Sequence, residues 1–207
     1  MKAEILARVR SAIGTRVSEV PVARNYRQTG TLDEAARLGQ FITRLEDYNA
    51  GLYRCAPDEL PATIASVMAA RQKPALVIPP GLTQDWLPAD QTFLRDNNLS
   101  WAELDQSHGV LTACTVAISL TGTIILSHSP SEGRRALTLI PDYHLCVVFA
   151  GQVVETVPEG LRKLRETKGR PITTISGPSA TADIEMIRIK GVHGPRFLDV
   201  ILVGGAG

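Results

Sequence analysis

Short apolar runs alternate along this chain with segments of helical spacing, and this alternation limits the folds open to it. The runs at residues 74–79 and 145–150, and a last one at Phe197–Val203, have the length and composition of buried strands. Strands of a parallel sheet are covered on both faces, so they are apolar along their whole length. The pattern therefore predicts an α/β fold, a three-layer sandwich with a mostly parallel central sheet between helices.

Apolar residues at helical spacing predict four amphipathic helices, at residues 2–13, 31–48, 58–72 and 157–167. Thr31 followed by Glu34 fits a capping box, in which the two side chains cap the start of the second helix. Residues 14–30 show no clear period. We therefore expect an N-terminal helical arm over residues 1–30 and a single domain over residues 31–207. Weaker signals predict two further elements, a short helix at residues 89–97 and a strand at residues 99–104.

A strand and a tight turn open residues 172–194, ITTISGPSATADIEMIRIKGVHG. Residues 172–176 are mostly apolar or β-branched, which predicts a strand covered on both faces. Gly177 and Pro178 break it, because Gly permits unusual φ/ψ values and Pro disfavours helix in the residue before it. Ser179 is then placed to cap a helix.

That helix carries Ile184 and Ile187 on one face, and Gly191 fits the left-handed residue just after it. A helix start preceded by a Ser-Gly-Pro-Ser turn presents unpaired backbone N–H groups and the positive end of a helix dipole, which together form an anion site. The alternative is an ordinary βα turn in which Asp183 complements the dipole, and on physical grounds alone it is the commoner case.

Two joined motifs carry a family resemblance. The string SGPSATADIE, followed by GVHGP and the final run FLDVILV, resembles the C-terminal signature of the LUD-domain family. The fold of that family is similar to the group that contains glucosamine-6-phosphate deaminase (NagB), ribose-5-phosphate isomerase (RpiA) and the CoA-transferases. The resemblance therefore implies a NagB/RpiA/CoA-transferase-like domain.

The resemblance extends to a Thr-Gly-Thr turn, which in the family usually follows an acidic residue. Here Leu120 takes that place, so any chemistry of the carboxylate is lost. A Gly between hydroxyl residues can still bring backbone N–H groups close to an anion, although a plain β-turn is the commoner role. With the family in view we predict an anion-binding cradle formed by Thr121, Gly122, Thr123, Ser176, Gly177, Ser179 and Thr181.

Residues 127–135 are the most polar stretch and follow a predicted strand, and open α/β sheets bind ligands at the carboxyl ends of their strands. Arg134 and Arg135 are able to clamp a carboxylate or phosphate, and His128 is able to act as a general acid or base. The alternative is a solvated loop whose arginines pair with nearby acids. An Arg soon after the Thr-Gly-Thr strand is also common in the family, so Arg134 joins the predicted site.

His193 lies in the Gly-Val-His-Gly-Pro turn that returns the chain to the sheet. Two roles are open to it. It either faces the same pocket as Ser179, or it is a turn histidine bonded to backbone. We include His193 in the predicted site, and we assign no catalytic residue.

Several classes of protein and site are disfavoured by composition. The net charge is +1, so nucleic acid is not an expected partner. No apolar run reaches a membrane span and the start lacks a signal-peptide core, so we expect a soluble cytoplasmic protein. Three dispersed cysteines without C-x-x-C argue against disulfides and iron–sulfur ligation, and Cys146 is expected to be a buried small hydrophobe. The histidines lack metal spacing, so we predict no metal and no cofactor.

The resemblance implies a function as well as a fold. A LUD-domain subunit would belong to a system that oxidises L-lactate to pyruvate, in which partner subunits carry iron–sulfur clusters and this chain binds a small anion or acts as a scaffold. A stand-alone enzyme acting on a phosphorylated small molecule or an acyl-CoA is an alternative that rests on fold analogy. A structural or regulatory module without a ligand is the third possibility.

Overall fold

The chain folds into two larger β-sheets with helices packed against them, as the computed structural model shows for residues 2–14, 23, 25–167, 169–181, 189–191 and 193–204. The helices are α1 (Lys2–Ile13), α2 (Glu34–Asp47), α3 (Leu60–Ala70), α4 (Trp101–Asp105) and α5 (Val157–Leu164). The strands are β1 (Gly51–Cys55), β2 (Ala75–Ile78), β3 (Thr92–Arg95), β4 (Val110–Thr112), β5 (Val116–Ile118), β6 (Thr123–Leu126), β7 (Tyr143–Phe149), β8 (Val153–Val154), β9 (Thr173–Ile175), β10 (Ala180–Thr181), β11 (Ile189–Lys190) and β12 (Phe197–Val203).

The larger sheet has six strands in the order β1-β12-β7-β4-β2-β3, and every pair within it is parallel. β12 pairs with β7 along its whole length, from Phe197 opposite Tyr143 to Val203 opposite Phe149. The strands predicted near residues 74–79 and 145–150, and at Phe197–Val203, are confirmed as β2, β7 and β12. The α/β class and the parallel sheet follow the prediction.

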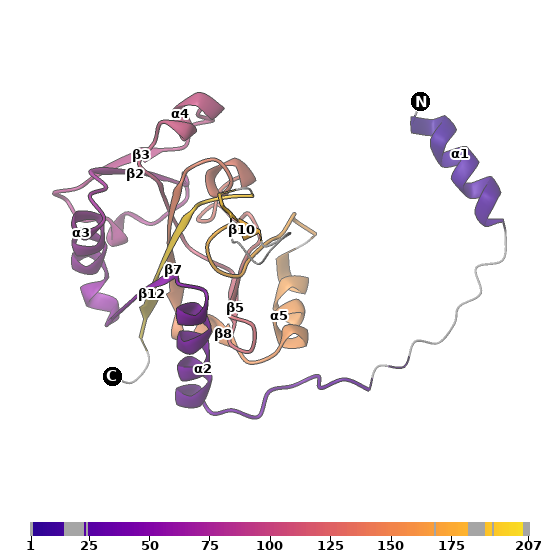
Figure 1. Ribbon diagram of the computed structural model, residues 1–207, viewed down its shortest axis with the longest axis horizontal. Coiled ribbons are helices and arrows are strands. Elements are labelled where there is room, and N and C mark those ends of the chain that lie inside the picture. The colour runs from indigo at the N-terminus through magenta and orange to yellow at the C-terminus, as the bar shows by residue number, and fades with distance from the viewer. Residues whose placement is uncertain are drawn as a thin grey trace.

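The two faces of the parallel sheet are covered differently (Figure 1). Along β12, Ile201 and Val203 pack with α3, whereas Val200 and Leu202 pack with α2 and with residues of the second sheet. The predicted apolar stripe of α2 is confirmed, because Leu38, Phe41 and Leu45 are all buried. One face therefore has the expected helical cover, and the other has a helix together with a second sheet.

The second sheet is small and mixed, with the strand order β8-β5-β6-β9. β5 and β6 form an antiparallel pair, and β9 runs antiparallel to β6 at the edge. The predicted strand at residues 172–176 thus exists as β9, but it is not covered on both faces, since Thr174 is exposed. α5 covers the outer face of this sheet, and Gly160 lies so close to Ile118 that a Cβ would come within 2.8 Å of its side chain.

Two predicted elements are exchanged in type. The segment predicted as a helix at residues 89–97 contains β3, which pairs with β2 at the edge of the parallel sheet. The segment predicted as a strand at residues 99–104 contains α4 instead. Ser100 caps α4 in a capping box with Glu103, and this local signal was overlooked.

The chain before α2 is joined to the domain by two acidic residues, Glu155 and Glu159. The Glu159 carboxylate accepts a hydrogen bond from the backbone N–H of Gly30 (2.9 Å). The Glu155 carboxylate accepts backbone hydrogen bonds from Thr31 (2.5 Å) and Leu32 (2.7 Å) and pairs with Arg27 (2.8 Å). These N–H groups, first that of Leu32, hold the pKa of Glu155 below its usual value. The predicted first helix is confirmed as α1, which buries none of its residues (Figure 1). The boundary between an arm over residues 1–30 and a domain over residues 31–207 stays a prediction.

Two predicted caps differ in the structure. The N-cap of α2 is Asp33, whose carboxylate accepts from the backbone N–H of Ala36 (2.8 Å), and not Thr31. No helix begins at Ser179, because β10 follows it directly and pairs antiparallel with β11. Gly191 does have positive φ (+88°), but it follows a strand. Asp183, Ile184 and Ile187 lie outside the described residues.

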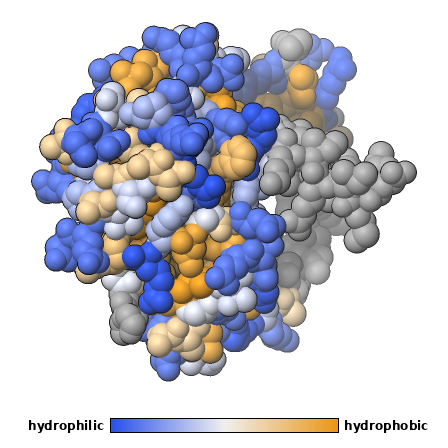
Figure 2. Space-filling view, turned by 60° about the vertical axis from the view of Figure 1, so that its left-hand side comes forward, coloured by the Kyte–Doolittle hydropathy of each residue, from blue (hydrophilic) through white to orange (hydrophobic). Residues whose placement is uncertain are grey.

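The surface beside α3 is polar over most of its area, with hydrophobic side chains in small separate groups (Figure 2). None of the helices in the described part of the chain is long and apolar enough to cross a membrane. Cys146 is fully buried, as predicted.

Candidate functional site

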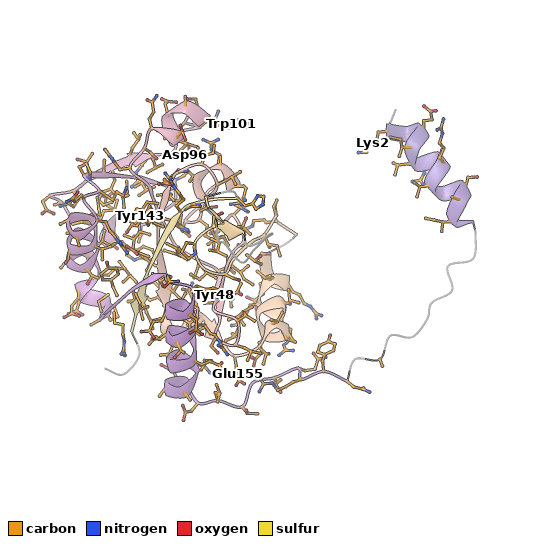
Figure 3. All side chains as sticks on the ribbon, viewed as in Figure 1. Lys2, Tyr48, Asp96, Trp101, Tyr143 and Glu155 are labelled. Carbon is orange, nitrogen blue, oxygen red and sulfur yellow. The ribbon has the colours of Figure 1, made fainter. Side chains whose placement is uncertain are left out.

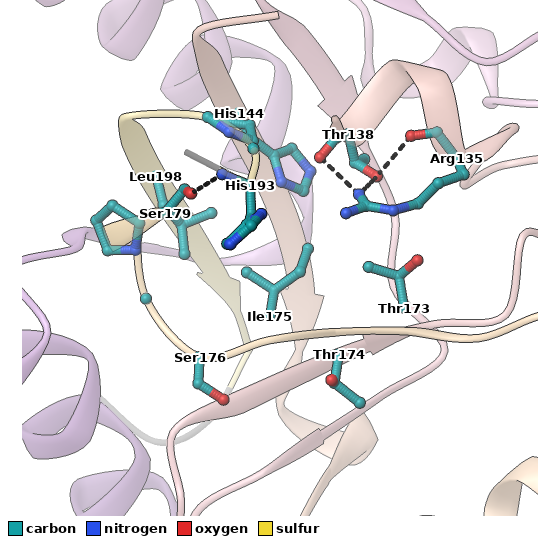
Figure 4. A pocket seen from close by; sticks show the side chains of 14 residues that line it. Arg135, Thr138, His144, Thr173, Thr174, Ile175, Ser176, Ser179, His193 and Leu198 are labelled. Atoms are coloured by element: carbon teal, nitrogen blue, oxygen red, sulfur yellow. Dashed lines mark hydrogen bonds between the residues drawn. The ribbon is translucent and has the colours of Figure 1, made fainter. Parts of the chain in front are cut away.

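A pocket of about 220 Å³ opens where the small sheet meets the parallel sheet (Figure 4). Three parts of the chain form it: residues 173–179, residues 193–195, and the 3-10 turn at Arg135–Thr138 with the strand that follows. Four residues of the predicted site line it, Ser176, Gly177, Ser179 and His193. The two motifs that carry the family resemblance therefore meet at one place.

The pocket lies at the amino edge of the parallel sheet. His144 is the second residue of β7, Leu198 is the second residue of β12, and both line it. The prediction placed a ligand site in residues 127–135 at the carboxyl end of a strand. Of those residues, Arg135 reaches this pocket.

The Ser-Gly-Pro-Ser turn is held by close packing and by a second turn. Gly177 has φ of +83°, and a Cβ there would come within 2.6 Å of the Tyr48 Cβ at the end of α2, so only glycine fits. Figure 3 labels Tyr48 at this place. The Ser179 hydroxyl accepts a hydrogen bond from the backbone N–H of His193 (2.9 Å), which joins the two turns across the pocket.

Arg135 is the cation of the pocket. Its Nη1 donates to the carbonyl oxygen (2.9 Å) and to the hydroxyl (3.2 Å) of Thr138. Its Nε and Nη2 have no hydrogen-bond partner, and its guanidinium no ion pair, among the described residues. Partial burial lowers the pKa of this guanidinium, yet arginine stays protonated at neutral pH. The pocket thus offers a positive charge with unused donors, which suits a carboxylate or a phosphate.

His144 was missed by sequence reasoning. It is 1% exposed, and its Nε2 shares a hydrogen bond of 2.8 Å with Oγ1 of Thr112 on the neighbouring strand β4. The available signal was a histidine inside the otherwise apolar run of β7, which the prediction treated only as a strand. His144 and His193 bring two imidazole groups to one pocket (Figure 4).

The Thr-Gly-Thr turn lies behind the pocket and does not line it. A chain of hydroxyl groups leads from Thr121 to Thr123 (2.7 Å) and on to Ser176 (2.8 Å). Gly122 has φ of +60°, and a Cβ there would lie 2.6 Å from the Cβ of Arg44 on α2. The turn therefore supports Ser176, and α2 holds both glycine turns in place.

Arg134 turns away from the pocket and pairs with Asp96. Its Nε and Nη2 donate to the two oxygens of the carboxylate (2.8 and 2.9 Å), and Nη2 also donates to the carbonyl oxygen of Leu99. This guanidinium holds the pKa of Asp96 below its usual value, and the carboxylate in turn raises the pKa of Arg134. Thr181 lies in β10 and is not among the described lining residues.

The loop between β6 and β7 is fixed by Glu132 and His128. The Glu132 carboxylate, 2% exposed, accepts from the backbone N–H groups of Ser127 (2.7 Å) and Ser129 (3.1 Å). His128 has φ of +53° and bonds the carbonyl oxygen of Gly133 through Nδ1 (2.8 Å). That Nδ1 must carry a proton, so in the neutral ring Nε2 (2.9 Å) accepts from Oγ1 of Thr173, which lines the pocket.

Comparison with known protein families matches residues 38–203 to the LUD domain. The chain belongs to the LUD-domain family. It is 45% identical over 207 residues to lactate utilization protein C of Deinococcus radiodurans, covering 98% of this chain and 95% of that one. It is 30% identical to lactate utilization protein C of Bacillus subtilis over 135 residues, 59% of this chain and 55% of that one.

A solved structure shows the same architecture. The crystal structure of a DUF162 family protein from Deinococcus radiodurans matches with a TM-score of 0.74 at 44% sequence identity. The match covers 84% of this chain and 100% of that one. At this identity the likeness extends beyond fold to sequence.

In this LUD domain, Leu120 lies in the turn between β5 and β6, outside the pocket. It is 39% exposed, and its carbonyl oxygen accepts from Nε of Arg44 (3.3 Å). The residue that replaces the usual acid is therefore not among the described residues lining the pocket.

The described lining of the LUD-domain pocket contains hydroxyls, two histidines and one arginine, and no carboxylate. Glu132 is used within its own loop, and Asp183 is outside the described residues. No group of three or more His, Cys, Asp or Glu able to hold a metal occurs in the described part of the chain. The two buried cysteines Cys114 and Cys146 are not among the described lining residues, so neither offers a nucleophile to the pocket. The arrangement suits binding of a small anion.

Proposed function

We propose that this chain is a subunit of an L-lactate utilization system and binds lactate or pyruvate in the pocket at Arg135. The observation that carries the proposal is a cation with unused donors in a small pocket formed by the two motifs of the family. The name shared by the relatives from Deinococcus and Bacillus supports the choice of lactate.

The pocket chemistry fits a 2-hydroxy or 2-oxo acid. The free edge of the Arg135 guanidinium receives the carboxylate, and two N–H···O bonds orient it. The imidazole of His193 then faces the oxygen on the second carbon. A volume of about 220 Å³ is below the usual range of roughly 300–1,000 Å³ for drug-sized ligands, so a three-carbon acid is favoured over a cofactor.

The oxidation of lactate itself is assigned to iron–sulfur partner proteins. The support is the family membership together with the three dispersed cysteines of this chain, of which Cys114 and Cys146 are buried. In this view the subunit presents substrate to its partners. Purification from the native host at native expression levels tests the assignment, and the absence of any iron–sulfur protein from the purified assembly counts against it.

A stand-alone acyl-CoA or sugar-phosphate enzyme is a weaker candidate. Carboxylate-based acyl transfer needs an acid at the site, and the described lining residues include none. We also propose that the fold of this chain is similar to that of the NagB/RpiA/CoA-transferase group. The parallel sheet and the family membership support this proposal.

Calorimetric titration and thermal melting of the full chain with L-lactate, pyruvate and acetate test the binding. A ligand at 100 times its dissociation constant adds about 2.7 kcal/mol, which raises Tm by about 5–10 °C for a chain of this size. Arg135→Gln should weaken lactate binding at least tenfold. The matched control is Arg165→Gln, because Arg165 is exposed and lies outside the pocket. Equal affinities of wild type and Arg135→Gln for lactate would contradict the proposed binding site.

A further inference from the structure

A second and wider groove, of about 750 Å³, lies at the opposite edge of the parallel sheet. Pro80 follows the end of β2, and Asp96 and Asn98 follow the end of β3, so this is the carboxyl edge. The remaining wall is the loop from His128 to Arg134, together with Arg170. Its volume lies within the usual range for pockets that hold an organic ligand.

The groove is beside the topological switch point of the sheet. From β2 the chain crosses outward to β3, whereas from β4, which neighbours β2 on the other side, it passes through β5 and β6 of the second sheet and re-enters the parallel sheet further inward at β7. Loops that leave the carboxyl ends of such neighbouring strands in opposite directions leave a crevice, where open α/β sheets bind their ligands. Pro80 at the end of β2 lies in the lining.

The polar side of the groove is preorganised. Asp96 is 7% exposed and holds Arg134 by two parallel hydrogen bonds, which fixes the plane of the guanidinium. Nη1 of Arg134 is left without a partner among the described residues. Asn98 (φ +65°) and His128 (φ +53°) adopt the left-handed conformation, and both line the groove. Such backbone persists where the surrounding contacts determine it.

The charge of the groove is positive. Arg134 and Arg170 contribute two positive charges, and Asp96 one negative charge, so these three sum to +1. Arg170 is exposed, and its side chain has no hydrogen bond or ion pair with the described part of the chain. The proline rings of Pro80 and Pro130 supply apolar surface beside these cations.

We propose that this groove is a second binding site, distinct from the pocket at Arg135, for a phosphorylated small molecule. Arg170 and the free Nη1 of Arg134 receive the phosphate, because guanidinium groups match phosphate geometry. The organic part of the ligand lies along the prolines, and the Asn98 amide is available to its hydroxyl groups. The proposal does not depend on lactate binding, since no residue of the argument lines the other pocket.

Calorimetric titration of the full chain with ADP, glucose 6-phosphate and inorganic phosphate tests this site. We expect ADP or glucose 6-phosphate to bind more tightly than inorganic phosphate, because the groove exceeds the size of a phosphate ion. Arg170→Gln should weaken that binding three- to tenfold, and Arg170→Glu more than tenfold. Arg170 is exposed and unpaired among the described residues, so both variants should fold.

Arg165→Gln is the matched control, since it removes an exposed arginine that lies outside the groove. It should leave the affinity within twofold of wild type. The proposal is overturned if no probe binds at millimolar concentration, if inorganic phosphate binds as tightly as both organic phosphates, or if Arg170→Glu binds like wild type. A failure of lactate to bind would not contradict this second site, and a failure of the phosphate compounds to bind would not contradict the lactate site.

Discussion

Arg134 and Arg135 are neighbours in the chain but serve the two cavities in opposite ways. Arg134 gives two of its nitrogens to the buried Asp96 and forms part of a rigid wall at the carboxyl edge of the parallel sheet. Arg135 keeps unused donors at the amino edge. Arg134, held on two nitrogens by a buried carboxylate, contributes to stability and leaves only Nη1 for a ligand, whereas Arg135 leaves both Nε and Nη2 for one.

The largest expected effect concerns the wall of the pocket at Arg135. Gly177→Ala places a Cβ 2.6 Å from the Tyr48 Cβ at a φ of +83°, so strain and overpacking add to a loss of roughly 2–5 kcal/mol. Gly169 has φ of +71° with nothing within 4 Å, so Gly169→Ala should cost only about 1–2 kcal/mol. Urea unfolding measures both, and equal losses would show that Tyr48 does not constrain the turn.

The two arginines should differ strongly in their effect on folding. Arg134→Leu leaves the Asp96 carboxylate buried without its cation, and we expect a loss of about 2–4 kcal/mol, discounted because Arg134 is partly exposed. Arg135→Leu should change the free energy of unfolding by about 0.5 kcal/mol or less. Similar unfolding midpoints for the two variants would contradict the division between them.

Acid should remove the Arg134 contribution without a mutation. The pKa of Asp96 is depressed in the folded chain, so its stabilisation is fully present above the unfolded value near 3.8 and is lost as pH falls through the folded value. We expect the difference in free energy of unfolding between wild type and Asp96→Asn to become smaller below about pH 4. The decrease should not exceed the free energy that Arg134→Leu removes. Chemical denaturation from pH 6 to pH 2.5 measures it, and a difference independent of pH would mean that the pair is not charged.

The smallest effect concerns the hydrogen bond that lies between the cavities. Thr173→Val removes the hydroxyl that meets Nε2 of His128 (2.9 Å), at a cost of about 1 kcal/mol. Thr173→Ser keeps the hydroxyl and should lose less. Calorimetric unfolding of both variants gives the comparison, and a serine variant as unstable as the valine variant would assign the effect to the lost methyl group instead.

Much of the fold was predictable from local signals. α2, α3 and α5 show helical spacing, and β2, β7 and β12 are apolar runs, so each was identified near its place. β3 is a four-residue edge strand whose type depends on its pairing with β2, which no local pattern records. The second sheet was missed for the same reason, because an apolar run does not show whether the strand that pairs with it is parallel or antiparallel.

The site was predictable in part. The pairing of Ser179 with the turn at His193 brings together two motifs that the sequence had already marked. Thr121 and Thr123 support Ser176 from behind, a placement that needs the β5–β6 turn and β9 in register. His144 was missed because a histidine in an apolar run does not show whether it lines a pocket, which depends on where the folded sheet places β7.

The sequence by itself determined the α/β class and the family, because these rest on period, composition and motif spacing. The tertiary structure alone decided which arginine is free. Asp96 lies 38 residues from Arg134 in the chain, and only the folded sheet brings its carboxylate within 2.8 Å of that guanidinium and leaves the next one open. Long-range pairing of charges depends on burial and geometry, and neither can be predicted from the residues next to each arginine in the sequence.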